Sequence, residues 1–236
     1  MSTEHIPINE RIIFALDVAD PRQAIELVDG LESHIKFFKV GLQLFFAGGW
    51  SVVDHIVGRG NKVMLDLKLY DIPATVTLAV KQFADRGISL TTVHGFTPVV
   101  EAALAASTDI NILAVTVLTS MGQEHLKEQG VSGTVEELVT KRAKAVIQCG
   151  CHGIVCSAQE ARPLRNQLGN DFLMVTPGIR PTGAAAGDQQ RIATPGQAIG
   201  DGSDYLVIGR PIRDAVNRAQ VITAIQQEIE AALSSP

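Results

Sequence analysis

The sequence predicts an α/β protein built as one closed barrel of eight parallel strands, the (β/α)8 or TIM barrel. Short apolar runs rich in β-branched residues alternate with helical patterns along the whole chain. Most connections between them are short, and the 236 residues are close to the ~250 that are typical of such a barrel. No linker-like or low-complexity segment divides the chain, so we expect a single domain over residues 1–236.

Four strand–helix pairs are expected in the first half of the chain. The strands are residues 12–17, 37–41, 62–67 and 90–94. Asp20 and Pro21 provide an N-cap and a first-turn proline for the helix after the first strand. The later helices are expected near residues 51–59, 75–86 and 98–107, and Gly87 is the expected stop of the one at 75–86.

The second half repeats this alternation with one longer connection. The strands are residues 111–118, 153–156, 172–176 and 205–208. Residues 119–134 precede a helix that ends near Cys149 and Gly150, and two more helices are expected over about 159–168 and 216–233. An open doubly wound sheet is the alternative, but the Gly-x-Gly-x-x-Gly of a dinucleotide-binding sheet is absent after the first strand, where residues 16–20 read Leu-Asp-Val-Ala-Asp.

Composition and charge exclude several classes of function. The chain is 46% hydrophobic and 19% charged, so it can bury a large core, and its net charge of −5 argues against general binding of nucleic acid. No run approaches the ~18 consecutive apolar residues of a membrane span. The first residues, Met-Ser-Thr-Glu-His-Ile-Pro, lack the pattern of a signal peptide. We therefore expect a cytoplasmic protein without a membrane partner.

The three cysteines form neither a disulfide framework nor a convincing metal site. Cys149, Cys151 and Cys156 are odd in number and lie close together in the sequence. With His152 they look superficially like metal ligands, but no second Cys-x-x-Cys completes a set. Buried thiols are the favoured interpretation, and no metal site is expected.

Charged residues occur at the carboxyl ends of the first three expected strands, where barrels of this class hold their active sites. Asp17 ends the first strand, Lys39 lies on the second, and Asp66 and Lys68 lie on the third. Because strand side chains alternate, Asp66 and Lys68 share one face and their apolar neighbours point to the other. A structural Asp–Lys pair would explain one bridge, but not four charges of alternating sign at neighbouring strand ends. These residues are therefore candidates for an active site.

The last two strands end in residues suited to an anion. Barrels commonly bind phosphate at the loops after strands seven and eight, through backbone N–H groups and a short helix N-terminus. Strand seven leads to Arg180. Strand eight leads to Gly209, which allows close backbone approach, and to Arg210, whose planar fork suits phosphate oxygens. The alternative is that Arg210 only forms a surface ion pair. The small residues of the loop 181–190 suit a segment that closes over a ligand.

Thr119 and Ser120 follow the fifth strand, between these two halves of the barrel mouth. Their hydroxyl and N–H groups suit the polar edge of a heterocycle or a carbonyl ligand. A Thr-Ser pair in a loop is also common as a helix cap or turn, so this signal is weak on its own.

Taken in chain order, seven stretches carry a family resemblance. They are Ala15-Leu16-Asp17, Lys39-Val40-Gly41, Asp66-x-Lys68-x-x-Asp71-Ile72-Pro73-x-Thr75, Val115-Thr116-Val117-Leu118-Thr119-Ser120, Val175-Thr176-Pro177-Gly178-Ile179-Arg180-Pro181, Gly187-Asp188-Gln189 and Ile208-Gly209-Arg210-Pro211. Together they resemble the bacterial orotidine 5′-phosphate decarboxylase family. The match extends from the first strand to the eighth, with no departure at a functional position.

The resemblance implies a homodimer that decarboxylates orotidine 5′-phosphate to UMP and CO2 in pyrimidine biosynthesis, without a metal or organic cofactor. Lys68 would protonate the C6 carbanion, and Lys39, Asp66, Lys68 and Asp71 would form a network of alternating charge. Asp71 would reach into the neighbouring subunit's site. Asp17 and Lys39 would bind ribose hydroxyls and Ser120 the pyrimidine edge. The full set of substrate-binding residues that it implies is Asp17, Lys39, Asp66, Thr75, Thr119, Ser120, Arg180, Gln189, Gly209 and Arg210.

Two other functions remain as alternatives. Related barrels share the Asp-x-Lys-x-x-Asp motif and act on sugar phosphates through a Mg²⁺-stabilised enediolate, with a glutamate at the strand-two position. That position is Lys39 here, and an ammonium cannot bind Mg²⁺. A non-catalytic phosphate-binding barrel is the third hypothesis, but it has no use for Lys68 between Asp66 and Asp71.

Overall fold

The computed structural model describes residues 6–106, 109–181 and 192–234, and it confirms the predicted barrel. Eight parallel strands follow one another in chain order around the barrel, and β1 pairs with both β2 and β8, so the sheet is closed. The strands are β1 (Ile12–Ala15), β2 (Phe37–Gly41), β3 (Lys62–Leu69), β4 (Ile88–His94), β5 (Asn111–Val115), β6 (Gly153–Val155), β7 (Leu173–Thr176) and β8 (Tyr205–Ile208).

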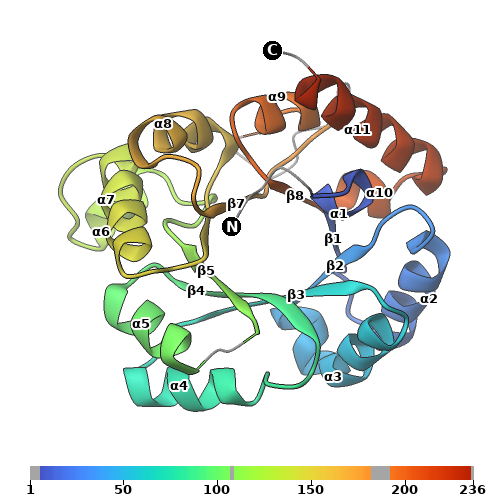
Figure 1. Ribbon diagram of the computed structural model, residues 1–236, viewed down its shortest axis with the longest axis horizontal. Helices are drawn as coiled ribbons and strands as arrows, with labels where there is room; N and C mark the ends of the chain where they lie inside the picture. Colours follow the sequence, from blue (N-terminus) through green and yellow to red (C-terminus); the bar gives the residue numbers. More distant parts are fainter. Residues whose placement is uncertain (1–5, 107–108, 182–191, 235–236) are drawn as a thin grey trace.

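The helices lie around the outside of this ring of strands (Figure 1). They are α1 (Ile8–Arg11), α2 (Pro21–Leu31), α3 (Leu42–Gly58), α4 (Pro73–Lys81), α5 (Thr97–Ala106), α6 (Gln123–Glu128), α7 (Val135–Gln148), α8 (Ala158–Leu168), α9 (Pro195–Gly200), α10 (Arg210–Arg213) and α11 (Arg218–Leu233). Among the described residues, no helix is both long and apolar enough to cross a membrane.

Strand alternation divides the apolar side chains into two clusters. One fills the inside of the barrel, and its members include Ile13, Phe37 and Met64. The other lies between the strands and the helices, and it takes the intervening residues such as Ile12 and Phe14. Burial of these side chains is the main source of stability. It also holds the carboxyl ends of neighbouring strands in fixed register, as in the pairing of Ala15 with Lys39.

The boundaries differ from the predicted ones in ways that the chain geometry explains. β1 ends at Ala15 and β5 at Val115, earlier than predicted, whereas β3 continues to Leu69, beyond its predicted end at residue 67. The helix predicted at 51–59 begins instead at Leu42, directly after β2. It contains a kink at Gly48, whose φ of 139° only glycine adopts readily. The short helices α1, α6, α9 and α10 were not predicted, since each has only one or two turns.

Candidate functional site

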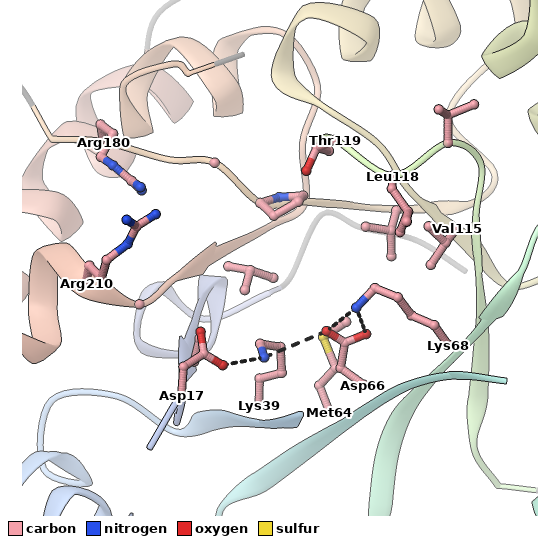
Figure 2. A pocket seen from close by; sticks show the side chains of 17 residues that line it. Asp17, Lys39, Met64, Asp66, Lys68, Val115, Leu118, Thr119, Arg180 and Arg210 are labelled. Carbon is pink, nitrogen blue, oxygen red and sulfur yellow. Dashed lines mark hydrogen bonds and ion pairs between the residues drawn. The ribbon is translucent and has the colours of Figure 1, made fainter. Parts of the chain in front are cut away.

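A pocket of about 210 Å³ opens at the carboxyl ends of the strands, the side predicted to hold the site. Figure 2 shows it from close by, with charged side chains on two opposite sides. Apolar side chains that include Met64, Val115 and Leu118 line the space between them. The sequence-predicted residues that line it are Asp17, Lys39, Asp66, Lys68, Thr119, Arg180, Gly209 and Arg210.

One side of the pocket is a row of alternating charges contributed by β1, β2 and β3. Lys39 Nζ lies 3.0 Å from Asp17 Oδ1 and 3.7 Å from Asp66 Oδ2. Lys68 Nζ donates to both oxygens of Asp66, at 2.8 Å each. Asp66 is therefore shared by two ammonium groups, and dashed lines mark these interactions in Figure 2. The structure thus brings Asp17, Lys39, Asp66 and Lys68 together at one side of the pocket.

The row of charges depends on Gly41, which has no side chain and lies next to the Lys39 ammonium. A Cβ placed on Gly41 would lie 3.0 Å from Lys39 Nζ and 3.8 Å from Asp17 Oδ1. That first distance is tighter than an ordinary van der Waals contact. Gly41, the last residue of β2, thus leaves room for the Lys39 ammonium between its two carboxylates.

Lys68 occupies an irregular point in its strand. β3 pairs with β4 at Leu65 and Thr91, and next at Leu69 and Val93, so four positions on β3 lie opposite two on β4. Lys68 lies within this irregular segment with a φ of 49°. Residues other than glycine rarely adopt such a backbone, and in folded proteins this kind of strain often occurs at functional sites.

The two lysines also set the charge state of Asp66. Burial alone would raise the pKa of this carboxyl group, but the nearby Lys39 and Lys68 ammonium groups oppose that effect. Hydrogen bonds from Lys68 and Thr92 act in the same direction, and the net result is a pKa below the ordinary value. Asp66 is thus an ionised carboxylate at neutral pH, although its side chain is only 12% exposed.

The opposite side of the pocket carries the two predicted arginines. Arg180 follows β7 and is buried, with Nη1 donating to the Ile179 carbonyl at 2.8 Å. Gly209 follows β8 and directly precedes Arg210, the first residue of α10. In Figure 2 both guanidinium groups point into the pocket from the side opposite the charged row. Two cations facing one space make this side suited to an anionic group.

Three predicted site residues do not line the pocket of the single chain, and a fourth lies outside the described residues. Asp71 and Thr75 are exposed beyond the end of β3, and Asp71 Oδ1 accepts a hydrogen bond from its neighbour, the N–H of Ile72. Ser120 is exposed next to Thr119, which does line the pocket. Gln189 lies outside the described residues, as does most of the loop 181–190.

Thr92 is a site-associated residue that the sequence analysis did not identify. It lies on β4, is fully buried, and donates from Oγ1 to Asp66 Oδ1 at 2.8 Å. Alternation along β4 places Thr92 on the interior face with Leu90. This position, two residues after Leu90, is the sequence signal that could have identified it.

The thiols and potential metal ligands give no second site. Cys151 and Cys156 are buried as predicted, and Cys149 is half-buried. Burial raises the pKa of the Cys151 thiol to about 11, so it is a protonated, unreactive group at neutral pH. Over the part of the chain that the structure describes, no three His, Cys, Asp or Glu side chains are grouped to hold a metal ion.

Comparisons with known proteins agree with this geometry. A model of the family described as "Orotidine 5'-phosphate decarboxylase / HUMPS family" matches residues 10–225. A protein of Afipia carboxidovorans named orotidine 5′-phosphate decarboxylase is 48% identical over 225 residues, which cover 94% of this chain and 96% of that protein. A protein of the same name from Rhodopseudomonas palustris is 45% identical over 237 residues and covers 100% of both chains.

Solved structures give the same result. The crystal structure of orotidine 5′-phosphate decarboxylase from Lactobacillus acidophilus matches with a TM-score of 0.82 at 35% sequence identity. The match covers 93% of this chain and 99% of that one.

Proposed function

The chain belongs to the orotidine 5′-phosphate decarboxylase / HUMPS family and is a carboxy-lyase, and we propose that it converts orotidine 5′-phosphate to UMP and CO2 with Lys68 as the proton donor. The observation that carries the proposal is the Lys68 ammonium held by both oxygens of Asp66 inside the pocket. This reaction is a step of pyrimidine biosynthesis. A cytoplasmic location and a single domain over residues 1–236 remain predictions from the sequence.

The reaction places a specific demand on the site. When the bond from C6 to the carboxylate breaks, CO2 leaves and the electron pair stays on C6 as a vinylic carbanion without a conjugated electron sink. An ammonium fixed beside C6 stabilises that charge as it develops and then transfers a proton to it. The resulting neutral amine of Lys68 regains its proton from solvent. Asp66 pairs with the Lys68 ammonium before the reaction and limits the directions in which its Nζ can point.

Asp66 has a second role in this proposal. With Lys68 beside C6, the Asp66 carboxylate lies near the carboxylate that the substrate loses. Two like charges ~4 Å apart repel by about 4 kcal/mol at an effective dielectric of 20. This repulsion is present in the bound substrate and is relieved as CO2 leaves, so it favours the transition state over the ground state.

The two sides of the pocket then bind opposite ends of the nucleotide. Arg180, Gly209 and Arg210 would bind the phosphate, together with Gln189. Asp17 and Lys39 would bind ribose hydroxyls at the rim of the charged row. Thr119, with Ser120 next to it, would meet the pyrimidine edge, and the apolar lining would pack on the ring. The phosphate lies far from the breaking bond, so its binding energy can be used to orient the reacting end.

We propose further that the enzyme works as a homodimer in which Asp71 and Thr75 enter the partner's site. Both residues are exposed and lie outside their own pocket. Next to them Tyr70, Ile72 and Phe96 are all more than half exposed, and the Tyr70 and Phe96 rings are 6.3 Å apart. Neighbouring apolar residues exposed beside an incomplete site suit an interface with a second copy, since a two-fold axis brings the same surface of each chain together.

A spectroscopic assay tests the reaction. The loss of orotidine 5′-phosphate absorbance is followed with and without EDTA, and we expect equal turnover in both conditions. The ion pairs of Lys39 with Asp17 and Asp66 favour this outcome, because these carboxylates already face an ammonium rather than a divalent cation. Turnover of sugar phosphates that EDTA abolishes would support the Mg²⁺-dependent alternative. No turnover of either substrate would support a non-catalytic barrel.

Subunit complementation tests the shared site. Lys68→Ala and Asp71→Ala, each inactive alone, are mixed under conditions that exchange subunits. In the heterodimer one site collects both substitutions and the other is wholly native. Statistical reassortment of equal amounts should then restore about a quarter of the wild-type activity. If subunits demonstrably exchange and no activity returns, Asp71 acts within its own chain.

A further inference from the structure

A single buried hydroxyl connects two neighbouring residues of the charged row, Asp66 and Lys68. Thr92, on β4, has no exposed surface. Its Oγ1 donates to Asp66 Oδ1 at 2.8 Å and accepts from the backbone N–H of Lys68 at 3.0 Å. The hydroxyl thus contacts the carboxylate that holds the Lys68 ammonium and also the main chain from which that lysine projects.

The second contact occurs where β3 is irregular. The pairing of β3 with β4 shifts between Leu65 and Leu69, and Lys68 has a φ of 49° in this segment. Thr92 gives the Lys68 N–H an acceptor that comes from a side chain rather than from the backbone ladder. A strained backbone persists only when its surroundings fix it, and this hydrogen bond is one such constraint.

We propose that Thr92 is a positioning residue, whose hydroxyl fixes the Asp66 carboxylate and the Lys68 backbone so that the Lys68 ammonium is aimed at C6 of the substrate. The inference rests on the proposed role of Lys68. Both contacts need one group that donates and accepts at the same time, which a hydroxyl does. Valine has nearly the same shape and can do neither, whereas serine can do both.

The neighbouring residue on β4 provides a matched control. Thr91 is also fully buried, and its Oγ1 also donates to β3, to the Leu65 carbonyl at 3.0 Å. By alternation it points to the helix side of the sheet and not to the pocket. Thr91→Val and Thr92→Val therefore each remove one buried hydroxyl between the same two strands, but only Thr92→Val removes it from Asp66 and Lys68.

The experiment measures kcat, KM, UMP affinity and Tm for Thr92→Val, Thr92→Ser and Thr91→Val. We expect kcat of Thr92→Val to fall by about 10- to 100-fold, the usual effect of losing a hydrogen bond to a charged group. KM and UMP affinity should change by less than about threefold, because the phosphate side is untouched. Both valine variants should lose about 2–4 °C in Tm. Thr91→Val should keep kcat within about twofold of wild type, and Thr92→Ser within about threefold.

Several results would overturn the proposal. They are a Thr92→Val kcat within threefold of wild type, an equal loss of kcat in Thr91→Val, or a serine variant as impaired as the valine variant. Lys68→Ala is measured alongside: if it keeps turnover, the role of Lys68 itself is wrong, whereas an inactive Lys68→Ala with a fully active Thr92→Val refutes only the role of Thr92. Should Thr92→Val not fold, Thr92→Ala replaces it under the same criteria.

Discussion

Replacing Asp66 by asparagine removes the carboxylate that Lys39 and Lys68 share, and it should destabilise the protein as well as inactivate it. The two ammonium groups lie 3.7 Å and 2.8 Å away. At an effective dielectric of 20 these distances correspond to gross attractions of about 4 and about 6 kcal/mol, most of which is offset by desolvation of the charges. Breaking a buried pair from one side costs about 3–5 kcal/mol, because the remaining charges stay buried without a partner. For a chain of this size that lowers Tm by about 6–20 °C.

The assay is thermal unfolding at fixed protein concentration, with Asp54→Asn as the control. Asp54 also pairs with a cation, since its Oδ1 lies 3.4 Å from Arg86 Nη1, but its side chain is 60% exposed. Such a surface pair contributes about 0–1 kcal/mol. If Asp66→Asn lowers Tm no more than Asp54→Asn does, Asp66 does not hold the charged row together.

The pH dependence of this effect has a defined sign. The pKa of Asp66 in the folded protein lies below its ordinary value of 3.8. A carboxyl group with a lowered folded pKa contributes stability that is present above its unfolded pKa and is lost as pH falls through the folded one. The difference in Tm between wild type and Asp66→Asn should therefore be nearly constant from about pH 8 down to about pH 5, and it should shrink only in stronger acid.

Three further predictions concern other parts of the molecule. Gly41→Ala should lower kcat/KM severalfold, because its Cβ would crowd Lys39 Nζ at 3.0 Å, and unchanged kinetics would show that the ammonium has room to move. Arg210→Ala should raise KM for orotidine 5′-phosphate but hardly affect the nucleoside without phosphate, and equal losses on both would assign Arg210 another role. Burial lowers the pKa of His152 below 6.5, and its Nδ1 accepts a hydrogen bond from the Ile112 N–H, so stability should fall as pH drops below about 6.5. Calorimetry should show a smaller fall in His152→Asn, and an identical fall would refute the assignment.

Much of the site could be predicted because strand alternation and barrel closure are strong constraints. Asp66 and Lys68 lie two positions apart in an otherwise apolar strand, so they had to share a face. Asp17 and Lys39 come from the neighbouring strands, and closure in chain order places all four residues on one side of the mouth. The same reasoning placed Arg210 at the end of the eighth strand, which closes the barrel beside the first.

Local irregularities could not be predicted, because they depend on contacts between distant segments. Alternation along β4 distinguishes Thr92 from Thr91, but it is the shifted pairing of β3 that brings Thr92 to the Lys68 N–H. The helix predicted at 51–59 also extends back to Leu42, and α3 is helical on both sides of the Gly48 kink. In contrast, α9 had a readable signal, since Thr194 and Gln197 form a capping box around Pro195.

The role of Lys68 is tested most directly by measuring turnover and UMP binding on the same preparation of Lys68→Ala. If Lys68 stabilises the carbanion and protonates C6, turnover should fall by at least the 10²–10⁴-fold typical of one general acid, while the folded protein still binds UMP. The proposed phosphate contacts come from Arg180, Gly209 and Arg210 and do not involve Lys68, which is why affinity for the product should survive. Turnover within tenfold of wild type, with UMP binding intact, would contradict the assignment.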